Sequence, residues 1–249
     1  MRALQPDVVV NAAAYTAVDQ AESDHDLSNI VNAQAPGVLA IEAAKLNALL
    51  VHYSTDYVFD GSGQRPWRET DTPAPLNVYG HSKLEGEARI QAAGGRHLIF
   101  RTSWVYASRG GNFAKTMLRL AQERERLTVI NDQFGAPTGA DLLADITAHV
   151  IGQVMQQPEQ TGLYHLTALG ETTWFEYAKY VIAKASIASP AIKIIAKDVV
   201  PVLSEAFKTA AQRPKNSRLN TEKLQTVFNL HLPPWEHGVD RMLAETLLP

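Results

Sequence analysis

The sequence predicts an α/β protein with a doubly wound, Rossmann-like parallel sheet and a smaller mixed α/β lobe. Short, β-branched apolar runs alternate with longer amphipathic stretches, and the last third of the chain is less regular and interrupted by prolines. Strands that alternate with helices in this way pair in parallel, because each helix carries the chain back across the sheet. The chain has 249 residues, enough for one large domain or two small ones.

The expected elements follow one another along the chain. Strands are expected at residues 8–10, 49–54, 97–103, 127–130 and 163–168, and helices at 78–92, 112–124, 139–155 and 172–185. Helix-rich sequence fills the interval between the first two strands. A loop rich in Gly and Pro, residues 56–77, precedes the helix at 78, and a loop of this length inside a compact domain is often functional.

The composition excludes several classes of protein. The net charge is −3, so the chain lacks the basic character of a nucleic-acid-binding protein. It contains no cysteine, which rules out thiol catalysis, a disulfide scaffold and cysteine-ligated zinc. No apolar run approaches the ~18 residues of a membrane span, and the first residues show no signal-peptide pattern. We therefore expect a cytoplasmic protein without nucleic-acid or membrane partners.

Tyr79 and Lys83 are the first candidates for chemistry, because their spacing puts a phenol and an ammonium on one face of a helix. A nearby positive charge stabilises a phenolate and lowers the pKa of the tyrosine. A tyrosine tuned in this way can give a proton to a carbonyl oxygen while hydride arrives at the carbon. Thr55, at the end of the preceding strand, could donate a second hydrogen bond to the same oxygen.

The spacing alone is weak, because Tyr180 and Lys184 repeat it. No strand ending in Ser or Thr leads into that second pair, and its helix is rich in aromatic residues, so a structural role is expected there. Tyr79 differs because it follows a strand that ends at Thr55 and the long loop. This context, and not the spacing, favours a functional reading of Tyr79 and Lys83.

Five blocks of sequence extend this pattern. They are STDYVFDG at 54–61, PLNVYGHSKLEGE at 75–87, RTSWVY at 101–106, NDQFGAPT at 131–138 and RPKNSRL at 213–219. Together the blocks resemble the extended short-chain dehydrogenase/reductase family and, within it, the dTDP-4-dehydrorhamnose reductases. The resemblance spans essentially the whole chain, and its specificity comes from the combination of blocks.

This resemblance implies reduction of the 4-keto group of dTDP-4-dehydro-β-L-rhamnose to dTDP-β-L-rhamnose by NADPH or NADH, a step toward cell-surface polysaccharides such as lipopolysaccharide. It makes Tyr79 the proton donor, and Lys83 the group that lowers the pKa of Tyr79 and holds the nicotinamide ribose. Thr55 then binds the reacting oxygen, Asp56 lies beside the sugar, and Trp104 packs on the substrate.

The resemblance also implies a cofactor site and a division into domains. The residues that would line the cofactor, besides Tyr79 and Lys83, are Ala12, Ala13, Ala14, Tyr15, Thr16 and Tyr53. Arg213 and Arg218 could bind the substrate diphosphate, because arginine presents a bidentate fork. Residues 1–115 would be the remainder of the NAD(P)-binding Rossmann domain, with 125–160 contributing, and residues 116–249 would be mainly a substrate-binding lobe.

One element of the family is missing from this sequence. Members begin with a strand, a Gly-rich turn and a helix, and the turn binds the cofactor pyrophosphate at the helix N-terminus. No glycine pair here, such as Gly61 with Gly63, has the right spacing or opens a helix. We therefore interpret the chain as truncated relative to the family, and expect weak NAD(P)H binding and marginal stability. The choice between NADH and NADPH stays open, because the residue that reads the adenosine ribose belongs to that element.

Other readings also stay open. Asp141, with Asp145 on the same expected helix, is a weak candidate for a Mg²⁺ site, although a solvated acidic face explains both residues. The family resemblance is compatible with a homodimer. A related sugar-nucleotide epimerase or dehydratase is an alternative, since Asp56 supplies an acidic residue beside Thr55. A regulatory subunit, like the β subunit of some methionine adenosyltransferases, is another; the missing turn favours it, and the retained Tyr79 opposes it.

Overall fold

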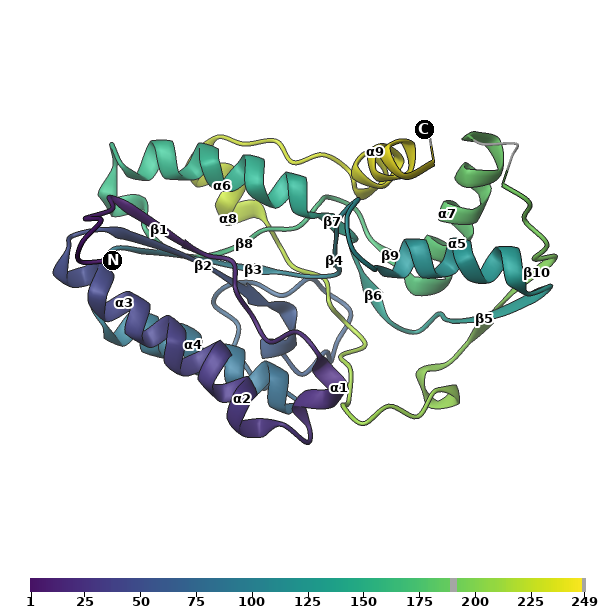
Figure 1. Ribbon diagram of the computed structural model, residues 1–249, viewed down its shortest axis with the longest axis horizontal. Helices are drawn as coiled ribbons and strands as arrows, with labels where there is room; N and C mark the ends of the chain where they lie inside the picture. Colours follow the sequence, from purple (N-terminus) through teal and green to yellow (C-terminus); the bar gives the residue numbers. More distant parts are fainter. Residues whose placement is uncertain (189–191, 248–249) are drawn as a thin grey trace. The chain divides into compact units, whose positions relative to one another are not determined.

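The computed structural model describes residues 1–188 and 192–247 (Figure 1). The chain divides into two compact units. The first unit comprises Met1–Thr102, Ala148–Leu166 and Thr209–Leu230, and the second comprises Ser103–Thr147, Thr167–Lys208 and His231–Pro249. Residues 209–230 were expected in the mainly substrate-binding lobe at 116–249. This segment belongs to the first unit because it is bonded to the loop at 56–77, as described below.

The first unit is built on a four-stranded parallel sheet of order β1-β2-β3-β8. Its strands are β1 (Val8–Asn11), β2 (Leu49–Thr55), β3 (His97–Thr102) and β8 (Gly162–His165). Six of the seven residues of β2 are buried, as expected for a central strand with helices on both faces. Asn11 lies directly opposite His52, and Thr55 opposite Thr102, so polar residues gather at the carboxyl edge.

Helices cover both faces of this sheet (Figure 1), which confirms the predicted doubly wound architecture. On one face, α3 (Ala35–Lys45) packs against α4 (Val78–Ala92), and both contact β2. On the other face lie α8 (Glu222–Phe228) and the end of α6 (Ala140–Val154). The segment between β1 and α3 forms α1 (Val18–Ala21), α2 (His25–Asn29) and the π-helical turn η1 (Ile30–Gln34).

The start of α4 is fixed by a cap and by close backbone packing. The Asn77 side chain accepts a hydrogen bond from the Gly80 backbone at 2.8 Å, which satisfies a free N–H of the first turn. A Cβ at Gly80 would lie 2.2 Å from the Tyr57 carbonyl oxygen, and a Cβ at Gly86 would lie 2.2 Å from the Asn32 carbonyl oxygen. Glycine at both positions therefore lets α4 approach neighbouring backbone closely.

The second unit combines helices with short strand pairs. Its helices, besides the start of α6, are α5 (Phe113–Glu123), α7 (Trp174–Ala188) and α9 (Trp235–Leu247). Its strands are β4 (Val105–Tyr106), β5 (Arg126–Ile130), β6 (Phe134–Gly135), β7 (Thr138–Gly139), β9 (Thr172–Thr173) and β10 (Asp198–Val202). Aromatic and aliphatic side chains of α5, α7 and α9 form one apolar core. The 3₁₀ turns η3 (Pro158–Gln160), in the first unit, and η4 (Ser204–Ala206) complete the described elements outside the loop at 56–77.

Strand β5 lies in the second unit and not in the Rossmann domain, where it was expected. Residues 125–160 were expected to contribute to the Rossmann domain. Residues 148–160 lie in the first unit, whereas β5 pairs in parallel with β10 inside the second unit. An apolar run predicts a strand without identifying its partner, which here lies about seventy residues further along the chain. No helix among the described residues is long and apolar enough to cross a membrane.

Candidate functional site

The candidate site lies at the carboxyl end of β2, where parallel α/β sheets place their ligands. Strand β2 ends at Thr55, and the chain turns at once into the 3₁₀ turn η2 (Asp56–Val58). The Thr55 hydroxyl accepts a hydrogen bond from the Tyr57 backbone at 3.2 Å and donates to the Asp56 carboxyl at 3.1 Å. This turn holds a hydroxyl and a carboxyl side by side at the sheet edge.

Tyr79 reaches the same place from the first turn of α4. Its hydroxyl is hydrogen-bonded to the Thr55 hydroxyl, and its ring meets the edge of Tyr57 at a centroid distance of 5.5 Å. The residue as a whole is partly exposed, and its hydroxyl is buried. Burial raises the pKa of Tyr79 to about 12, and the neighbouring Asp56 acts in the same direction. Tyr79 is therefore a neutral phenol at physiological pH.

Lys83 lies one turn further along α4 and is 1% exposed. Its ammonium donates to the Tyr53 carbonyl oxygen at 2.5 Å and lies 3.1 Å from His52 Nε2. Burial lowers the pKa of Lys83 to about 8, and the attraction of Glu87 opposes this shift. The sequence reasoning expected Lys83 to lower the pKa of Tyr79. In this structure the pKa of Tyr79 is raised, because desolvation dominates and the Lys83 ammonium contacts β2 instead.

A buried ion pair lies one turn beyond Lys83 along α4. Arg101 of β3 and Glu87 of α4 form a bidentate pair at 2.6 and 2.9 Å, and each side chain is 3% exposed. The Ser54 hydroxyl also donates to Glu87. Buried charges of this kind require a partner, because a carboxylate or guanidinium alone in the interior costs several kcal/mol. The pair therefore ties α4 to the sheet beside the candidate site.

Asp56 is a second unusual acid. It is 2% exposed, and burial raises its pKa to about 7 against hydrogen bonds from Ser217 and Thr55. Its carboxyl group therefore exists in both protonation states near neutral pH. Perturbed carboxyl groups at the edge of an α/β sheet are typical of functional sites, although structural networks also produce them.

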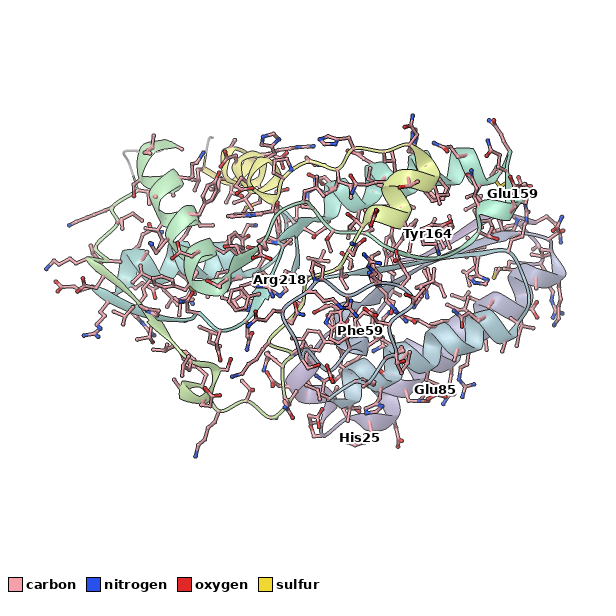
Figure 2. The ribbon with its side chains drawn as sticks, turned by 180° about the vertical axis from the view of Figure 1, so that it is seen from behind. His25, Phe59, Glu85, Glu159, Tyr164 and Arg218 are labelled. Atoms are coloured by element: carbon pink, nitrogen blue, oxygen red, sulfur yellow. The ribbon has the colours of Figure 1, made fainter. Side chains whose placement is uncertain are left out.

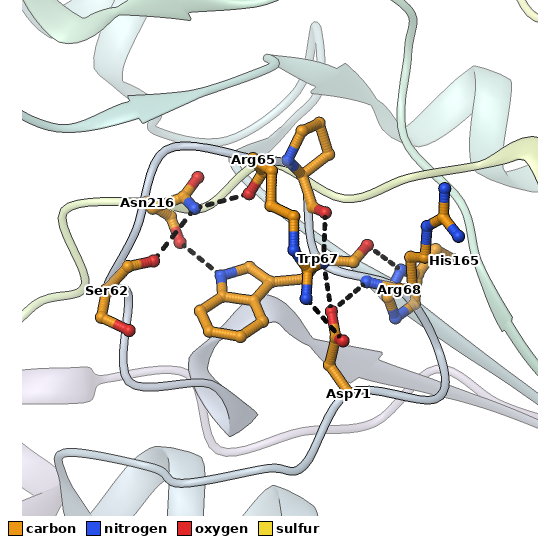
Figure 3. A network of polar contacts seen from close by, with 8 residues as sticks. Ser62, Arg65, Trp67, Arg68, Asp71, His165 and Asn216 are labelled. Atoms are coloured by element: carbon orange, nitrogen blue, oxygen red, sulfur yellow. Dashed lines mark hydrogen bonds and ion pairs between the residues drawn. The ribbon is translucent and has the colours of Figure 1, made fainter.

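The loop at 56–77 is held in place by the segment that contains Asn216 (Figure 3). The Asn216 amide donates to the Arg65 carbonyl oxygen at 2.8 Å and to that of Ser62 at 3.3 Å. The Trp67 indole N–H donates to the Asn216 carbonyl oxygen at 3.1 Å. Phe59 (Figure 2) stacks on Trp67 with ring centroids 4.6 Å apart. This long loop is consequently an ordered part of the first unit, adjoining the candidate site.

The expected cofactor-lining residues follow β1. Ala12, Ala13 and Ala14 are exposed, so backbone at the carboxyl end of β1 is accessible to a ligand. Tyr15 is fixed by its backbone N–H, which donates to Asn32 at 2.9 Å, and Thr16 is exposed. Tyr53 is partly exposed in β2, where its carbonyl oxygen accepts from the Lys83 ammonium.

The expected substrate residues are distributed over both units. Trp104 belongs to the second unit, where it stacks on Trp174 at a centroid distance of 3.7 Å. Its φ of 49° is unusual for a bulky residue, and strained backbone of this kind clusters at functional positions. Arg213 belongs to the first unit and forms a bidentate pair with Asp19 at 2.6 and 3.1 Å. The Arg213 fork is thus held by a carboxylate in this structure.

The weaker candidates have simpler explanations. Asp141 lies 3.5 Å from Arg241, and the described residues contain no group of three or more His, Asp or Glu side chains that could hold a metal. The structure therefore does not support the Mg²⁺ site for which Asp141 was a weak candidate. Tyr180 and Lys184 both donate to Asp240 at 2.8 Å, which links α7 to α9. This arrangement fits the structural role expected for that pair.

Three buried residues near the candidate site were not predicted from the sequence: His52, Arg101 and Ser217. His52 is fully buried, and its ring nitrogens lie 3.0 Å from the Asn11 amide and 3.1 Å from the Lys83 ammonium. A histidine inside an apolar strand was a usable signal, since a buried polar side chain needs partners. Arg101 carried the same signal in β3. Ser217 had none, because only the tertiary fold brings it to Asp56.

The fold and the site together define the class: a Rossmann-like protein of the short-chain dehydrogenase/reductase type, with a Thr, Tyr and Lys set at one sheet edge. The chain belongs to the family described as RmlD substrate binding domain, whose model matches residues 1–248. This membership agrees with the resemblance carried by the five sequence blocks.

Named relatives cover almost the whole chain. The dTDP-4-dehydrorhamnose reductase of Escherichia coli K12 is 56% identical over 98% of this chain and 81% of the relative. The enzyme of the same name from Sinorhizobium fredii is 41% identical over 100% of this chain and 83% of the relative. A crystal structure of dTDP-4-dehydrorhamnose reductase from Bacillus anthracis in complex with NADP is also similar, with a TM-score of 0.87 and 38% identity over 98% of this chain and 83% of that one.

Proposed function

We propose that this chain carries the catalytic side chains for reduction of the 4-keto group of dTDP-4-dehydro-β-L-rhamnose to dTDP-β-L-rhamnose by NADPH or NADH. The observation that carries the proposal is the hydrogen-bonded pair of Thr55 and Tyr79 hydroxyls at the end of β2, with Lys83 buried one turn further along α4. Relatives named for this reaction, which cover nearly all of the chain, support the substrate class. The product is a precursor for cell-surface polysaccharides.

The side chains of this chain would donate the proton that the reduced carbonyl oxygen takes up. A nicotinamide, when bound, would supply the hydride for the carbonyl carbon, and the carbonyl oxygen would then need a proton. Tyr79 is a neutral phenol, so it holds the proton that this oxygen needs. Thr55 would offer a second hydrogen bond to the same oxygen once its hydroxyl hydrogen turns from the Asp56 carboxyl. Lys83, on the same helix as Tyr79, would hold the nicotinamide ribose, and its charge would stabilise the phenolate that remains after proton transfer.

The residues present fit the nicotinamide half of a dinucleotide. Ala12, Ala13 and Ala14 are small and exposed at the end of β1, so a flat ring and a ribose can approach the backbone. Lys83 lies beside the Tyr53 backbone at the end of β2, within the same first unit. The sequence offers no Gly-rich turn for the pyrophosphate.

Within the first unit, substrate binding would involve Asp56 and Arg213. For Arg213 to take a diphosphate, its fork must exchange the Asp19 carboxylate for phosphate oxygens, which present the same bidentate geometry. A dehydratase-like use of Asp56 is the second candidate function. It is favoured by one observation, the pKa of about 7 that burial gives this carboxyl group. Formation of a keto-deoxy sugar from a dTDP-hexose, with loss of water and no net consumption of the nicotinamide, would identify that activity.

The decisive experiment compares two tyrosine variants at saturating NADPH. Oxidation of NADPH is followed with dTDP-4-dehydrorhamnose as the substrate. Tyr79→Phe should lower turnover by about 10²-fold or more, the usual contribution of a positioned general acid. Tyr180→Phe removes a hydroxyl from the pair with the same spacing and should leave turnover near that of the unmodified chain. Equal turnover in the two variants would reject the catalytic assignment of Tyr79.

A further inference from the structure

The Lys83 ammonium contacts a buried histidine, His52, that has no role in the proposed reduction. His52 is fully buried in β2, with Nε2 3.1 Å from the Lys83 ammonium and Nδ1 3.0 Å from the Asn11 amide nitrogen. Asn11 lies opposite His52 in the register of β1 and β2, and its amide oxygen accepts from the Ala13 backbone N–H at 3.2 Å. One chain of hydrogen bonds therefore runs from Lys83 to Ala13.

The neutral His52 ring can accept a hydrogen bond from only one of its two neighbours, Asn11 and Lys83, and must donate to the other. A neutral imidazole has one nitrogen that donates and one that accepts. Burial and the nearby Lys83 ammonium lower the pKa of His52 well below its ordinary value, so the ring stays neutral. His52 therefore accepts a hydrogen bond either from Asn11 or from Lys83.

Two self-consistent arrangements result. In the first, Asn11 accepts from Ala13 and donates to Nδ1, so Nε2 carries the proton and donates to Lys83, which must be the neutral amine. In the second, the Lys83 ammonium donates to Nε2, Nδ1 carries the proton, and the Asn11 amide turns over to accept it. The Ala13 N–H is then released. Passing from the second arrangement to the first releases one proton from Lys83 and moves the ring proton from Nδ1 to Nε2.

We propose that Asn11 and His52 form a hydrogen-bond relay that couples the charge on Lys83 to the backbone N–H of Ala13. The relay deepens the proposed reduction and rests on it for its use, because Ala13 lies in the segment that would line the cofactor. A ligand oxygen that accepts from the Ala13 N–H favours the arrangement with a charged Lys83. By linkage, filling the site then promotes the ammonium that the reduction needs.

The remaining groups around Lys83 set how easily it changes charge. Glu87, one turn along α4, favours the ammonium and is itself paired with Arg101 of β3. The Tyr53 carbonyl oxygen accepts from the ammonium. With burial, these groups bring the pKa of Lys83 to about 8, so both arrangements are accessible near neutral pH.

The first test reads the tautomer directly and needs neither substrate nor cofactor. In the full chain labelled with ¹⁵N-histidine, NMR should show His52 changing from the Nδ1–H to the Nε2–H tautomer as Lys83 loses its proton. The Lys83 signal, from ¹³C-labelled lysine, is identified by its loss in Lys83→Met. A His52 ring that keeps one tautomer throughout the Lys83 titration would overturn the relay.

Two variants of the same residue provide the second test. The longer side chain of His52→Gln keeps a hydrogen-bonding group at the position of Nε2, which faces Lys83. The shorter side chain of His52→Asn keeps one only at the position of Nδ1, which faces Asn11. The pKa of Lys83 should stay near its original value in the first and fall by about 1 to 2 in the second, because the ammonium loses an acceptor. His165→Gln is the matched control, since His165 is an equally buried histidine in β8, and should leave Lys83 unchanged.

Equal Lys83 pKa values in His52→Gln and His52→Asn would also overturn the relay. Should either variant fail to fold, the tautomer titration of the unmodified chain decides alone. The two proposals fail separately, because no readout here uses turnover. An inactive chain with a switching His52 tautomer would reject the reduction and keep the relay, and an active chain with a fixed tautomer would do the reverse.

Discussion

Two helices of this chain carry a tyrosine four residues before a lysine, yet the two pairs have opposite electrostatics. Lys83 in α4 is 1% exposed and bonds a backbone carbonyl oxygen and a histidine. The Lys184 side chain in α7 is 44% exposed and bonds the Asp240 carboxylate. Burial lowers the pKa of Lys83, whereas Asp240 raises the pKa of Lys184. Burial beside a strand end makes Tyr79 and Lys83 a candidate site, and the spacing that they share with Tyr180 and Lys184 does not.

The largest expected difference between the pairs is in turnover. Lys83→Met should lower NADPH-dependent reduction by about 10²- to 10⁴-fold, because the ammonium supports the proton transfer from Tyr79. Lys184→Met, which breaks a largely exposed ion pair between α7 and α9, should leave turnover within about twofold. Steady-state kinetics at saturating NADPH measures both. Substantial turnover in Lys83→Met would remove the functional distinction between the pairs.

The next effect concerns the support of α4. Glu87→Gln leaves Arg101 as an uncompensated buried charge and should lower the free energy of unfolding by about 3–5 kcal/mol. Glu85, two residues earlier, forms an exposed pair with Arg89, so Glu85→Gln should change stability by no more than about 0.5 kcal/mol. Urea denaturation of both variants tests this. Similar losses would mean that the Glu87 pair is no more stabilising than a surface pair.

A third effect is a pH dependence of opposite sign for the two lysines. The pKa of Lys83 is about 8 when folded and near 10.5 when unfolded. Between these values the unfolded chain binds more protons, so the contribution of Lys83 to stability rises with pH. The rise should be on the order of 1–3 kcal/mol and should disappear in Lys83→Met. Lys184 has a raised pKa, so its small contribution is lost at high pH instead.

Denaturation of the unmodified chain and Lys83→Met from neutral pH to pH ~10 isolates this contribution, because all other groups cancel in the difference. Lys184→Met serves as the control, and its difference from the unmodified chain should show no such rise. A flat difference for Lys83→Met would show that Lys83 titrates at its ordinary pKa. In that case burial would not distinguish the two lysines.

The sequence predicted the local parts of the site and missed the long-range ones. Helix α4 was expected at residues 78–92 and occurs there, because Asn77 caps its start and Gly94 follows its end. Thr55 was placed at a strand end for a similar local reason. The partners of Lys83 depend on the register of β1 against β2, which places Asn11 opposite His52 and which no local pattern encodes.

The direction of the Tyr79 pKa could not be predicted for the same reason. Spacing showed a cation nearby, but desolvation depends on how deeply the tertiary fold buries the hydroxyl, and that effect is the larger one. The segment around Asn216 illustrates the limit again. Its sequence looks like a separate stretch of the second lobe, and only its hydrogen bonds to Ser62 and Arg65 assign it to the first unit.

The smallest expected effects concern the residue that follows each tyrosine. In α7 it is Val181, which is fully buried in the apolar core, and in α4 it is Gly80, whose missing side chain lets the helix approach the Tyr57 carbonyl oxygen. Gly80→Ala should therefore lower the free energy of unfolding by about 1–3 kcal/mol, because the added methyl forces backbone apart. Gly152→Ala in α6, where a Cβ meets nothing within 4 Å, should instead stabilise by about 0.5–1 kcal/mol. Thermal or urea denaturation decides the signs. If both changes stabilise, α4 has room to move away from Tyr57, and the contact that holds Tyr79 beside Thr55 is less strict than the backbone packing indicates.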